Sequence, residues 1–136
     1  MPRKNHMLGQ WVKYGGLYPD WEYRLFRKEH GQWWDREVHS RIVVPGEIRI
    51  LDTPLIPHGM PNISKQLSNL DRYTRYEADE LKKKNKQFSF LKWLIGPPFI
   101  FIKRYFILQG FRDGWRGLFL AVYASFYIFM SHAKLL

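Results

Sequence analysis

The sequence predicts an α+β fold in which a small antiparallel sheet is followed by helices. Residues 10–60 alternate short runs of aromatic and β-branched residues with glycine and proline turns, which is the pattern of strands. After residue 61 the apolar residues recur every three or four positions, as in an amphipathic helix. Residues 81–136 carry nine of the ten net positive charges together with two long apolar runs. We therefore divide the chain into a strand-rich part (1–60), an amphipathic helix (61–86) and a helical tail (87–136).

Four strands are expected in the strand-rich part: Trp11–Tyr14, Glu22–Lys28, Arg36–Val44 and Ile48–Ile56. Turn-forming sequences such as Gly-Gly, Tyr-Pro-Asp, His-Gly-Gln and Pro-Gly punctuate them. The last two strands are expected to form a hairpin that turns at Pro45-Gly46.

A helix is expected from about residue 63 to about residue 84. Asn62 is a good N-cap, because its side-chain oxygen can accept a hydrogen bond from an amide of the first turn. The helix ends in the sequence KKKNK, which is typical both of a solvated helix end and of a segment that binds lipid phosphates. One helical stripe holds Ile63, Leu67, Leu70, Thr74, Ala78 and Leu81.

The tail combines basic and apolar residues. Its first apolar run, 88–108, is broken by Lys92, by Gly96-Pro97-Pro98 and by Lys103-Arg104, so a plain transmembrane helix is not expected there. The second run, 117–130, is uncharged but marginal in length for crossing a hydrocarbon core of about 30 Å. We expect two helices at an anionic membrane surface, peripheral or monotopic, with core helices of a soluble domain and a span at 117–130 as alternatives. The expected membrane-contacting residues are Lys82, Lys83, Lys84, Lys103, Arg104, Trp93 and Trp115.

Several chemistries lack support in the sequence. The chain has no cysteine, and its five histidines show no metal-binding spacing, so no metal site is expected within it. No phosphate-binding loop, dinucleotide fingerprint, nucleophile elbow or paired-aspartate motif occurs. The first 16 residues contain no apolar stretch of signal-peptide length. Nucleic-acid binding is disfavoured, because the basic residues are interleaved with long apolar runs.

One group of polar residues in the strand-rich part attracts attention: Asp20 on a turn, Arg24 and Arg27 on one expected strand, and His39 on another. Arginines suit the binding of phosphate and sugar-phosphate groups. Arg24 and Arg27 are three apart and so point to opposite faces of a strand, which lets one face a site that the other flanks. A purely structural role, with Asp20 stabilising its own turn and pairing with one arginine, is the alternative.

Four segments, in this order, carry a resemblance to a known family: GGLYPDWEYRLFRK, REVHSRIVVPGEIRILDTPLIPHG, LDRYTRYEADE and PPFIFIKRYFILQGFRDGWRGLFLAVYASFYIFMSHAKL. Together they resemble the C-terminal half of bacterial family 2 glycosyltransferases of the lipopolysaccharide-core glucosyltransferase type. YPDxxxRLFR and GFRDGWRG are the most distinctive parts, and the resemblance covers nearly the whole chain.

The resemblance implies the C-terminal part of a GT-A fold. The expected activity is transfer of a sugar, with glucose as the expected one, from a nucleotide sugar to a lipid-linked saccharide such as the lipopolysaccharide core, at the cytoplasmic face of the bacterial inner membrane. Members of the family begin with a nucleotide-binding region, and nothing before Gly15 corresponds to it. The chain is therefore expected to be a fragment, with a separate nucleotide-binding half as a partner. A Mg or Mn ion is expected in the complete enzyme and no cofactor in this chain.

The resemblance also implies site residues. Inverting sugar transfer needs a base for the acceptor hydroxyl, and where the family commonly has His-Glu this sequence has His39-Ser40. A serine cannot be that base at neutral pH, so the nearby carboxylates become the candidates. A non-catalytic, membrane-associated interaction module is the alternative function. The expected catalytic residues are Asp20, Glu37 and His39, and the expected substrate-binding residues are Tyr18, Arg24 and Arg27.

Overall fold

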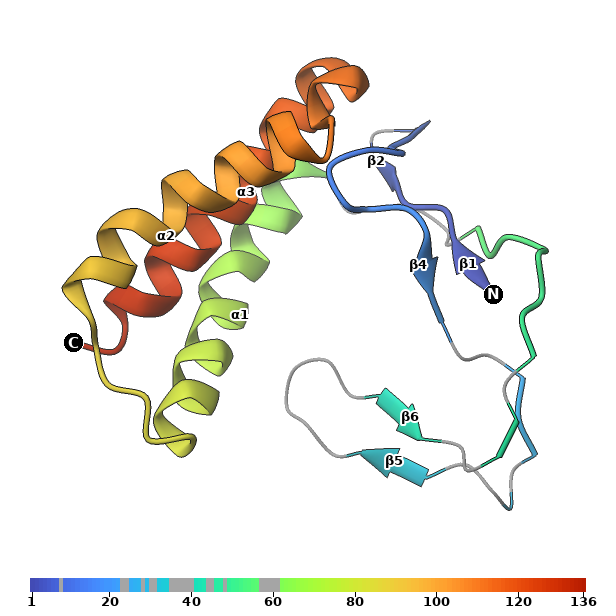
Figure 1. The fold of residues 1–136 in the computed structure, drawn as a ribbon, viewed down its shortest axis with the longest axis horizontal. Helices are drawn as coiled ribbons and strands as arrows, with labels where there is room; N and C mark the ends of the chain where they lie inside the picture. Colours follow the sequence, from blue (N-terminus) through green and yellow to red (C-terminus); the bar gives the residue numbers. More distant parts are fainter. Residues whose placement is uncertain are drawn as a thin grey trace.

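A computed structural model describes residues 1–7, 9–22, 25–27, 29, 32–34, 41–43, 46–47, 49–56 and 62–136. Short strands form the N-terminal part and three α-helices form the C-terminal part (Figure 1). The structure is therefore a mostly helical α+β arrangement, and the α+β prediction is confirmed at this level.

In the described residues of the N-terminal part, the strands form three antiparallel pairs. β1 (Pro2–Arg3) pairs with β4 (Asp20–Trp21), and β2 (His6–Met7) pairs with β3 (Gln10–Trp11). β5 (Gln32–Trp34) pairs with β6 (Arg41–Val43). The antiparallel pairing matches the prediction. β6 lies within the strand predicted at Arg36–Val44, whereas the other described strands differ in position from the predicted ones.

Two of the predicted strands and one predicted hairpin are wrong in position. The strand predicted at 11–14 ends at Trp11, and in the described residues of 48–56 only Leu55 makes a bridge, parallel to Arg3. This bridge is held by Lys4 N–H to Leu55 O (2.9 Å) and Leu55 N–H to Pro2 O (2.8 Å). β6 pairs with β5, and the described residues 49–54 form no strand beside it, so the hairpin that was expected to turn at Pro45-Gly46 is not found among the described residues.

The helix α1 (Ile63–Lys83) confirms the prediction for this segment. Asn62 is its N-cap, and Asn62 Oδ1 accepts the Lys65 amide at 2.9 Å. Leu70, Thr74 and Ala78, three members of the predicted stripe, are its buried residues. The stripe therefore marks the face of α1 that packs against the rest of the protein.

The tail folds into α2 (Phe90–Ile102), the π-helical turn η1 (Lys103–Ile107), the 3₁₀ turn η2 (Gly110–Asp113) and α3 (Gly114–Ala133). The prolines that interrupt the first apolar run do not interrupt the helix, because α2 continues through both Pro97 and Pro98. Proline removes an amide donor and usually interrupts a helix. Here α2 packs along α3, and Ser125 Oγ donates a hydrogen bond to Pro97 O at 2.7 Å. Contact with the neighbouring helix thus supports the proline-containing turn.

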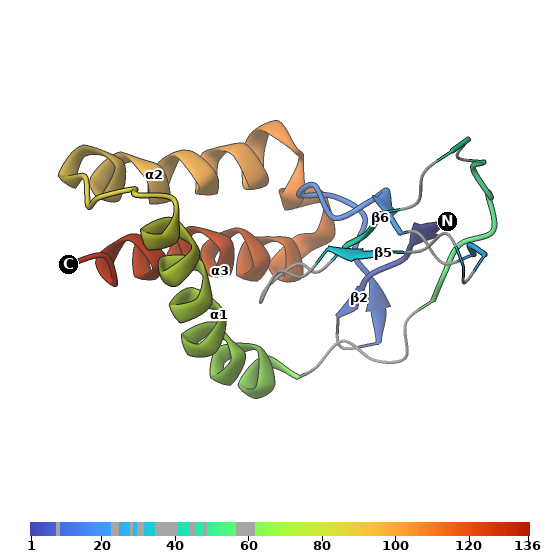
Figure 2. The same ribbon diagram turned by 90° about the horizontal axis from the view of Figure 1, so that it is seen from below.

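The helix α3 is central in the helical part. It contacts both α1 and α2, and it runs antiparallel to α2 (Figures 1 and 2). In Figure 1 the strands β1, β2 and β4 lie beyond the end of the hairpin where α2 turns into α3. Among the described residues, no helix combines the length and the apolar character that a membrane crossing requires.

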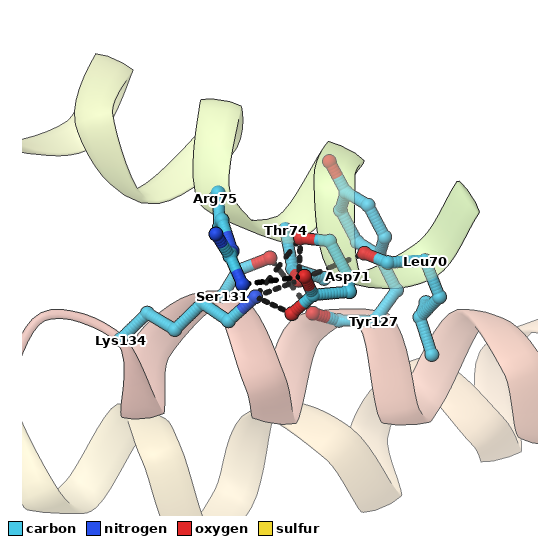
Figure 3. Close-up of polar contacts among 7 residues, drawn as sticks. All are labelled: Leu70, Asp71, Thr74, Arg75, Tyr127, Ser131 and Lys134. Carbon is cyan, nitrogen blue, oxygen red and sulfur yellow. Dashed lines mark hydrogen bonds and ion pairs between the residues drawn. The ribbon is translucent and has the colours of Figure 1, made fainter. Parts of the chain in front are cut away.

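A polar cluster joins α1 to the end of α3 (Figure 3). Lys134 Nζ, just past α3, donates to Asp71 O at 2.9 Å, to Asp71 Oδ1 at 2.8 Å and to Thr74 Oγ1 at 2.7 Å. Ser131 Oγ donates to Tyr127 O at 2.8 Å, and Tyr127 Oη donates to Glu77 Oε2 at 3.4 Å. The contacts that Lys134 and Tyr127 make with α1 fix its position along α3.

Candidate functional site

Asp20 lies in a small polar cluster that the pairing of β1 with β4 creates. The register of these strands sets Arg3 opposite Asp20. Arg3 Nε donates to Asp20 Oδ2 at 2.9 Å, and Asn5 Nδ2 donates to the same oxygen at 3.2 Å. Arg3 Nη1 also forms an ion pair with Glu22 Oε1 at 3.1 Å. Arg3 and Asn5 therefore hold the carboxylate of Asp20 in one orientation.

The cluster is partly open to solvent. The side chains of Arg3 and Asp20 are each about one-third exposed. Within the described part of the chain, the contacts of this carboxylate are made by Oδ2, which leaves Oδ1 as an acceptor for an additional donor. A fixed and accessible carboxylate oxygen is the arrangement that a general base requires.

Sequence reasoning missed Arg3 and Asn5. They lie 17 and 15 residues before Asp20 and reach it only because β1 and β4 pair. The basic character of the N-terminus gave no indication of that pairing. To find this cluster from the sequence, the pairing register of two strands of two residues each would have to be predicted. A sequence pattern this short does not specify a register.

The other predicted site residues have different surroundings. Tyr18 is exposed at the turn before β4, and its ring meets the Trp11 ring edge to face at 5.2 Å. Arg27 is exposed. Arg24, Glu37 and His39, three of the predicted residues, lie outside the described residues. The structure therefore places Asp20 with Arg3 and Asn5, and says nothing about its relation to these three.

The turn that presents Asp20 is docked on the helical part through Gly15 and Gly16. The Gly15 amide donates to Leu108 O at 2.9 Å, and Arg104 Nη1 donates to Gly15 O at 3.5 Å. Both glycines have positive φ, 69° and 78°, which side-chain-bearing residues rarely adopt. A Cβ on Gly16 would lie 2.9 Å from Leu108 Cδ1. The two glycines thus allow a close approach between the strand-rich part and the α2–α3 hairpin.

The sequence GFRDGWRG builds the other side of this contact. A Cβ on Gly117 would lie within 1.8 Å of Gly110 O, so α3 can begin beside η2 only with glycine at this position. Asp113 Oδ2 accepts the amides of Lys13 (3.0 Å) and Tyr14 (2.7 Å). Residues 13–16 therefore dock on Leu108 and on the GFRDGWRG segment, and this contact holds the turn that leads to Asp20.

The residues predicted to contact a membrane fall into two groups. Lys82, Lys83, Lys84, Lys103 and Trp115 are exposed. Arg104 instead turns towards the Gly15 carbonyl, and burial lowers its pKa below the usual value for arginine. Trp93 is half-buried against α3, with its ring 4.8 Å from the Phe129 ring.

A large apolar surface is exposed on the α2–α3 hairpin. No residue of α2 is buried. Large patches of exposed apolar surface are typical of interaction sites. We call it the α2–α3 apolar surface; it comprises Phe90, Leu91, Leu94, Ile95, Phe99, Ile102, Phe106, Ile107, Leu118, Val122 and Phe126.

The described residues contain no group of three or more histidine, aspartate or glutamate side chains that could hold a metal ion. Asp20 does not fit as a metal ligand here, because its carboxylate is paired with the Arg3 guanidinium.

Comparison with known proteins finds a distant similarity to a curated protein. No family model matches the chain, and no solved structure matches it. The lipopolysaccharide core biosynthesis glycosyltransferase LpsC of Rhizobium meliloti (strain 1021) is 28% identical to it over 114 residues. The match covers 82% of this chain and 42% of LpsC, so the chain spans less than half of the length of this relative. The chain is thus distantly similar to a lipopolysaccharide core glycosyltransferase.

Proposed function

We propose that this chain provides the acceptor-facing and membrane-facing part of a glycosyltransferase. The reaction is transfer of a sugar, glucose in the first instance, from a nucleotide sugar to a lipid-linked saccharide such as the lipopolysaccharide core. The similarity to LpsC over 82% of the chain is the observation that carries the proposal. A nucleotide-binding half, with its Mg or Mn ion, supplies the donor side of the reaction.

In this proposal Asp20 is the general base for the acceptor hydroxyl. Arg3 and Asn5 orient its carboxylate through Oδ2, so Oδ1 can accept the hydroxyl proton. Glu37 and His39 complete the catalytic group, and Tyr18, Arg24 and Arg27 bind the saccharide and its phosphates.

The α2–α3 apolar surface brings this site to the membrane that contains the acceptor. Its side chains enter the outer few ångströms of the leaflet, while Lys103 and the lysines at the end of α1 lie near anionic head groups. The proposed location is the cytoplasmic face of the bacterial inner membrane. Exposed apolar side chains next to a strongly basic segment support this part of the proposal.

A chimera tests the transferase function. Residues 1–136 replace the aligned segment of LpsC in a Rhizobium meliloti strain that lacks LpsC, and the lipopolysaccharide core is analysed by mass spectrometry. The proposal is supported if the chimera restores the missing sugar, if the Asp20→Asn chimera does not restore it, and if the Asp52→Asn chimera still does. A chimera that accumulates at the membrane without restoring the sugar would instead favour a non-catalytic interaction module.

Liposome flotation tests the membrane contact separately. Leu94 on α2 and Leu67 on α1 are exposed to a similar degree, 55% and 51%, and so form a matched pair. Leu94→Glu should reduce flotation with phosphatidylglycerol vesicles, because it places a charge in the α2–α3 apolar surface. Leu67→Glu should float like the unchanged chain. Equal flotation of both variants would show that the α2–α3 apolar surface does not contact the bilayer.

A further inference from the structure

A cavity of about 310 Å³ lies where β3 meets the beginning of α3. Gln10 and Trp11 line it from the strand-rich part, and Arg112, Trp115 and Arg116 line it from η2 and α3. None of the residues predicted to be catalytic or substrate-binding is among the described residues that line it. The cavity is therefore separate from the cluster around Asp20.

The cavity is strongly basic. Besides Arg112 and Arg116, the ammonium groups of Lys4 and Lys13 lie 4.5 Å and 4.3 Å from the centre of the Trp11 ring. Asp113 is the acidic residue in the described lining, and its Oδ2 already accepts two backbone amides. The cationic charge around the cavity thus exceeds the anionic charge.

Both arginines are held by neutral groups. The Arg112 guanidinium lies over the Tyr14 ring at 4.4 Å and donates to Gln109 Oε1 at 3.0 Å. The Arg116 guanidinium lies over the Trp115 ring at 4.8 Å, and its Nε donates to Met7 O at 3.3 Å. These contacts orient the guanidinium groups without neutralising their charge, and an anion can therefore bind there.

We propose that this cavity binds a phosphorylated monosaccharide unit. Arg112 and Arg116 bind the phosphate, and the half-exposed Trp115 ring and the Gln10 amide contact the sugar. A volume of about 310 Å³ is at the lower end of the range for small-molecule sites, so it suits one sugar phosphate better than a complete nucleotide sugar.

The inference deepens the proposed function and rests on it only for the source of the ligand. If the chain acts on a lipid-linked saccharide, the phosphorylated sugar belongs to that acceptor, and the cavity positions it relative to Asp20. Binding of a sugar phosphate can be measured without any transfer reaction, which keeps the two proposals experimentally separate.

Nuclear magnetic resonance titration of the full chain tests the site. Glucose 6-phosphate is the probe, glucose and UDP-glucose are the comparisons, and the indole N–H signals of Trp11 and Trp115 report on binding. We expect glucose 6-phosphate to shift the Trp115 signal and to bind at least about tenfold more tightly than glucose, because the phosphate contributes charge-assisted hydrogen bonds.

Charge-removing variants assign the binding to the arginine pair. Arg112→Gln/Arg116→Gln should weaken glucose 6-phosphate binding by about tenfold or more. Arg72→Gln/Arg75→Gln removes the same charge from the exposed face of α1 and should change it by less than about twofold. If circular dichroism shows that the double variant at the cavity is unfolded, Arg112→Gln alone provides the same test. The described contacts of the Arg112 side chain are with Gln109 and Tyr14.

Four results would overturn the inference: no binding of glucose 6-phosphate, equal binding of glucose, equal loss in the two double variants, or preferential binding of UDP-glucose.

Phosphatidylglycerol vesicles distinguish a lipid head group from a saccharide phosphate. A response of Trp115 to the vesicles but not to glucose 6-phosphate would assign the cavity to lipid phosphate and reject the saccharide. If the chain does not bind the sugar phosphate but the LpsC chimera transfers sugar, this inference is wrong and the proposed function stands. If the chain binds the sugar phosphate but the chimera transfers no sugar, the inference stands and the proposed function is wrong.

Discussion

The carboxylate of Asp113 accepts the backbone amide of Tyr14 at 2.7 Å, across 99 residues of sequence. Asp113 is the N-cap residue of α3, yet its side chain makes no cap hydrogen bond to that helix. It serves instead as the acceptor for two amides of the loop that leads from β3 to Asp20. The Asp113 side chain thereby joins the beginning of α3 to the loop that leads to the candidate site.

Asp113→Ala should destabilise the protein by about 2 kcal/mol, because two amides lose a charged acceptor. Hydrogen exchange of the Tyr14 amide should also become faster. Chemical denaturation and exchange measured by nuclear magnetic resonance check these two expectations. Asp79→Ala, on the exposed face of α1, is the control and should change stability by less than about 0.5 kcal/mol. Equal effects of the two substitutions would contradict a docking role for Asp113.

Gly117→Ala should destabilise the protein by about 3 kcal/mol or more, since the new Cβ would overlap Gly110 O at 1.8 Å. Gly96→Ala is a matched control, because it is also a helical glycine and its Cβ would lie at an acceptable 3.4 Å from Ile128 Cγ2. That substitution should be neutral or stabilise the protein by up to about 1 kcal/mol. Thermal unfolding of both variants provides the comparison, and a stable Gly117→Ala protein would show that η2 and α3 can separate.

Alkaline pH should destabilise the helical part through Tyr127. Burial, followed by the charge of Glu77 and their hydrogen bond, raises the pKa of Tyr127, and burial likewise raises the pKa of Tyr123. A raised pKa in the folded state means that this stability is complete below the pKa of an unfolded tyrosine and is lost as the pH rises above it. Tyr127→Phe should therefore flatten the decrease in urea-unfolding free energy above about pH 10. A decrease as steep as in the unchanged chain would exclude Tyr127 as the cause.

The pKa of Asp71 should depend on Lys134 more than on Arg75. The hydrogen bond from Lys134 is the largest cause that lowers this pKa, and the charge of Arg75 is a smaller one. Lys134→Gln should raise the pKa of Asp71 towards its ordinary value, and Arg75→Gln should raise it less. Carboxyl titration by nuclear magnetic resonance measures both changes. The reverse order would mean that Lys134 does not reach Asp71 in solution.

Arg3 should act as a positioning residue for Asp20. In the LpsC chimera, Arg3→Ala should lower kcat by about 10- to 100-fold, because the carboxylate loses its fixed orientation. Arg3→Lys keeps the charge and should recover part of the rate. Arg49→Ala, an exposed arginine of the same part, is the control. The transfer rate and its dependence on pH should be measured for each variant. If Arg3→Ala keeps both the full rate and the same pH dependence, Arg3 does not position Asp20.

The sequence alone determined the parts of the fold that depend on local interactions. The N-cap at Asn62 and the apolar stripe through Leu70, Thr74 and Ala78 predicted α1 with an error of one residue at its end. Their effects act within a few residues of one another, so no knowledge of the rest of the chain was needed. The antiparallel character of the strands and the helical tail were also predictable, and the resemblance in four segments agrees with the distant similarity to LpsC.

Only the tertiary structure decided which distant groups meet. Four features depend on residues or helices that are separate in sequence. They are the bridge between Arg3 and Leu55, the continuation of α2 through Pro97-Pro98, the contact of Asp20 with Arg3, and the contact of Asp113 with Tyr14. Local propensity opposed the helix at the prolines, and packing against α3 outweighed it. In the other three cases local propensity gives no information about the partner. A strand of two residues is too short for its sequence pattern to select the strand with which it pairs. A carboxylate can accept a hydrogen bond from any backbone amide that the packing of the chain brings near it.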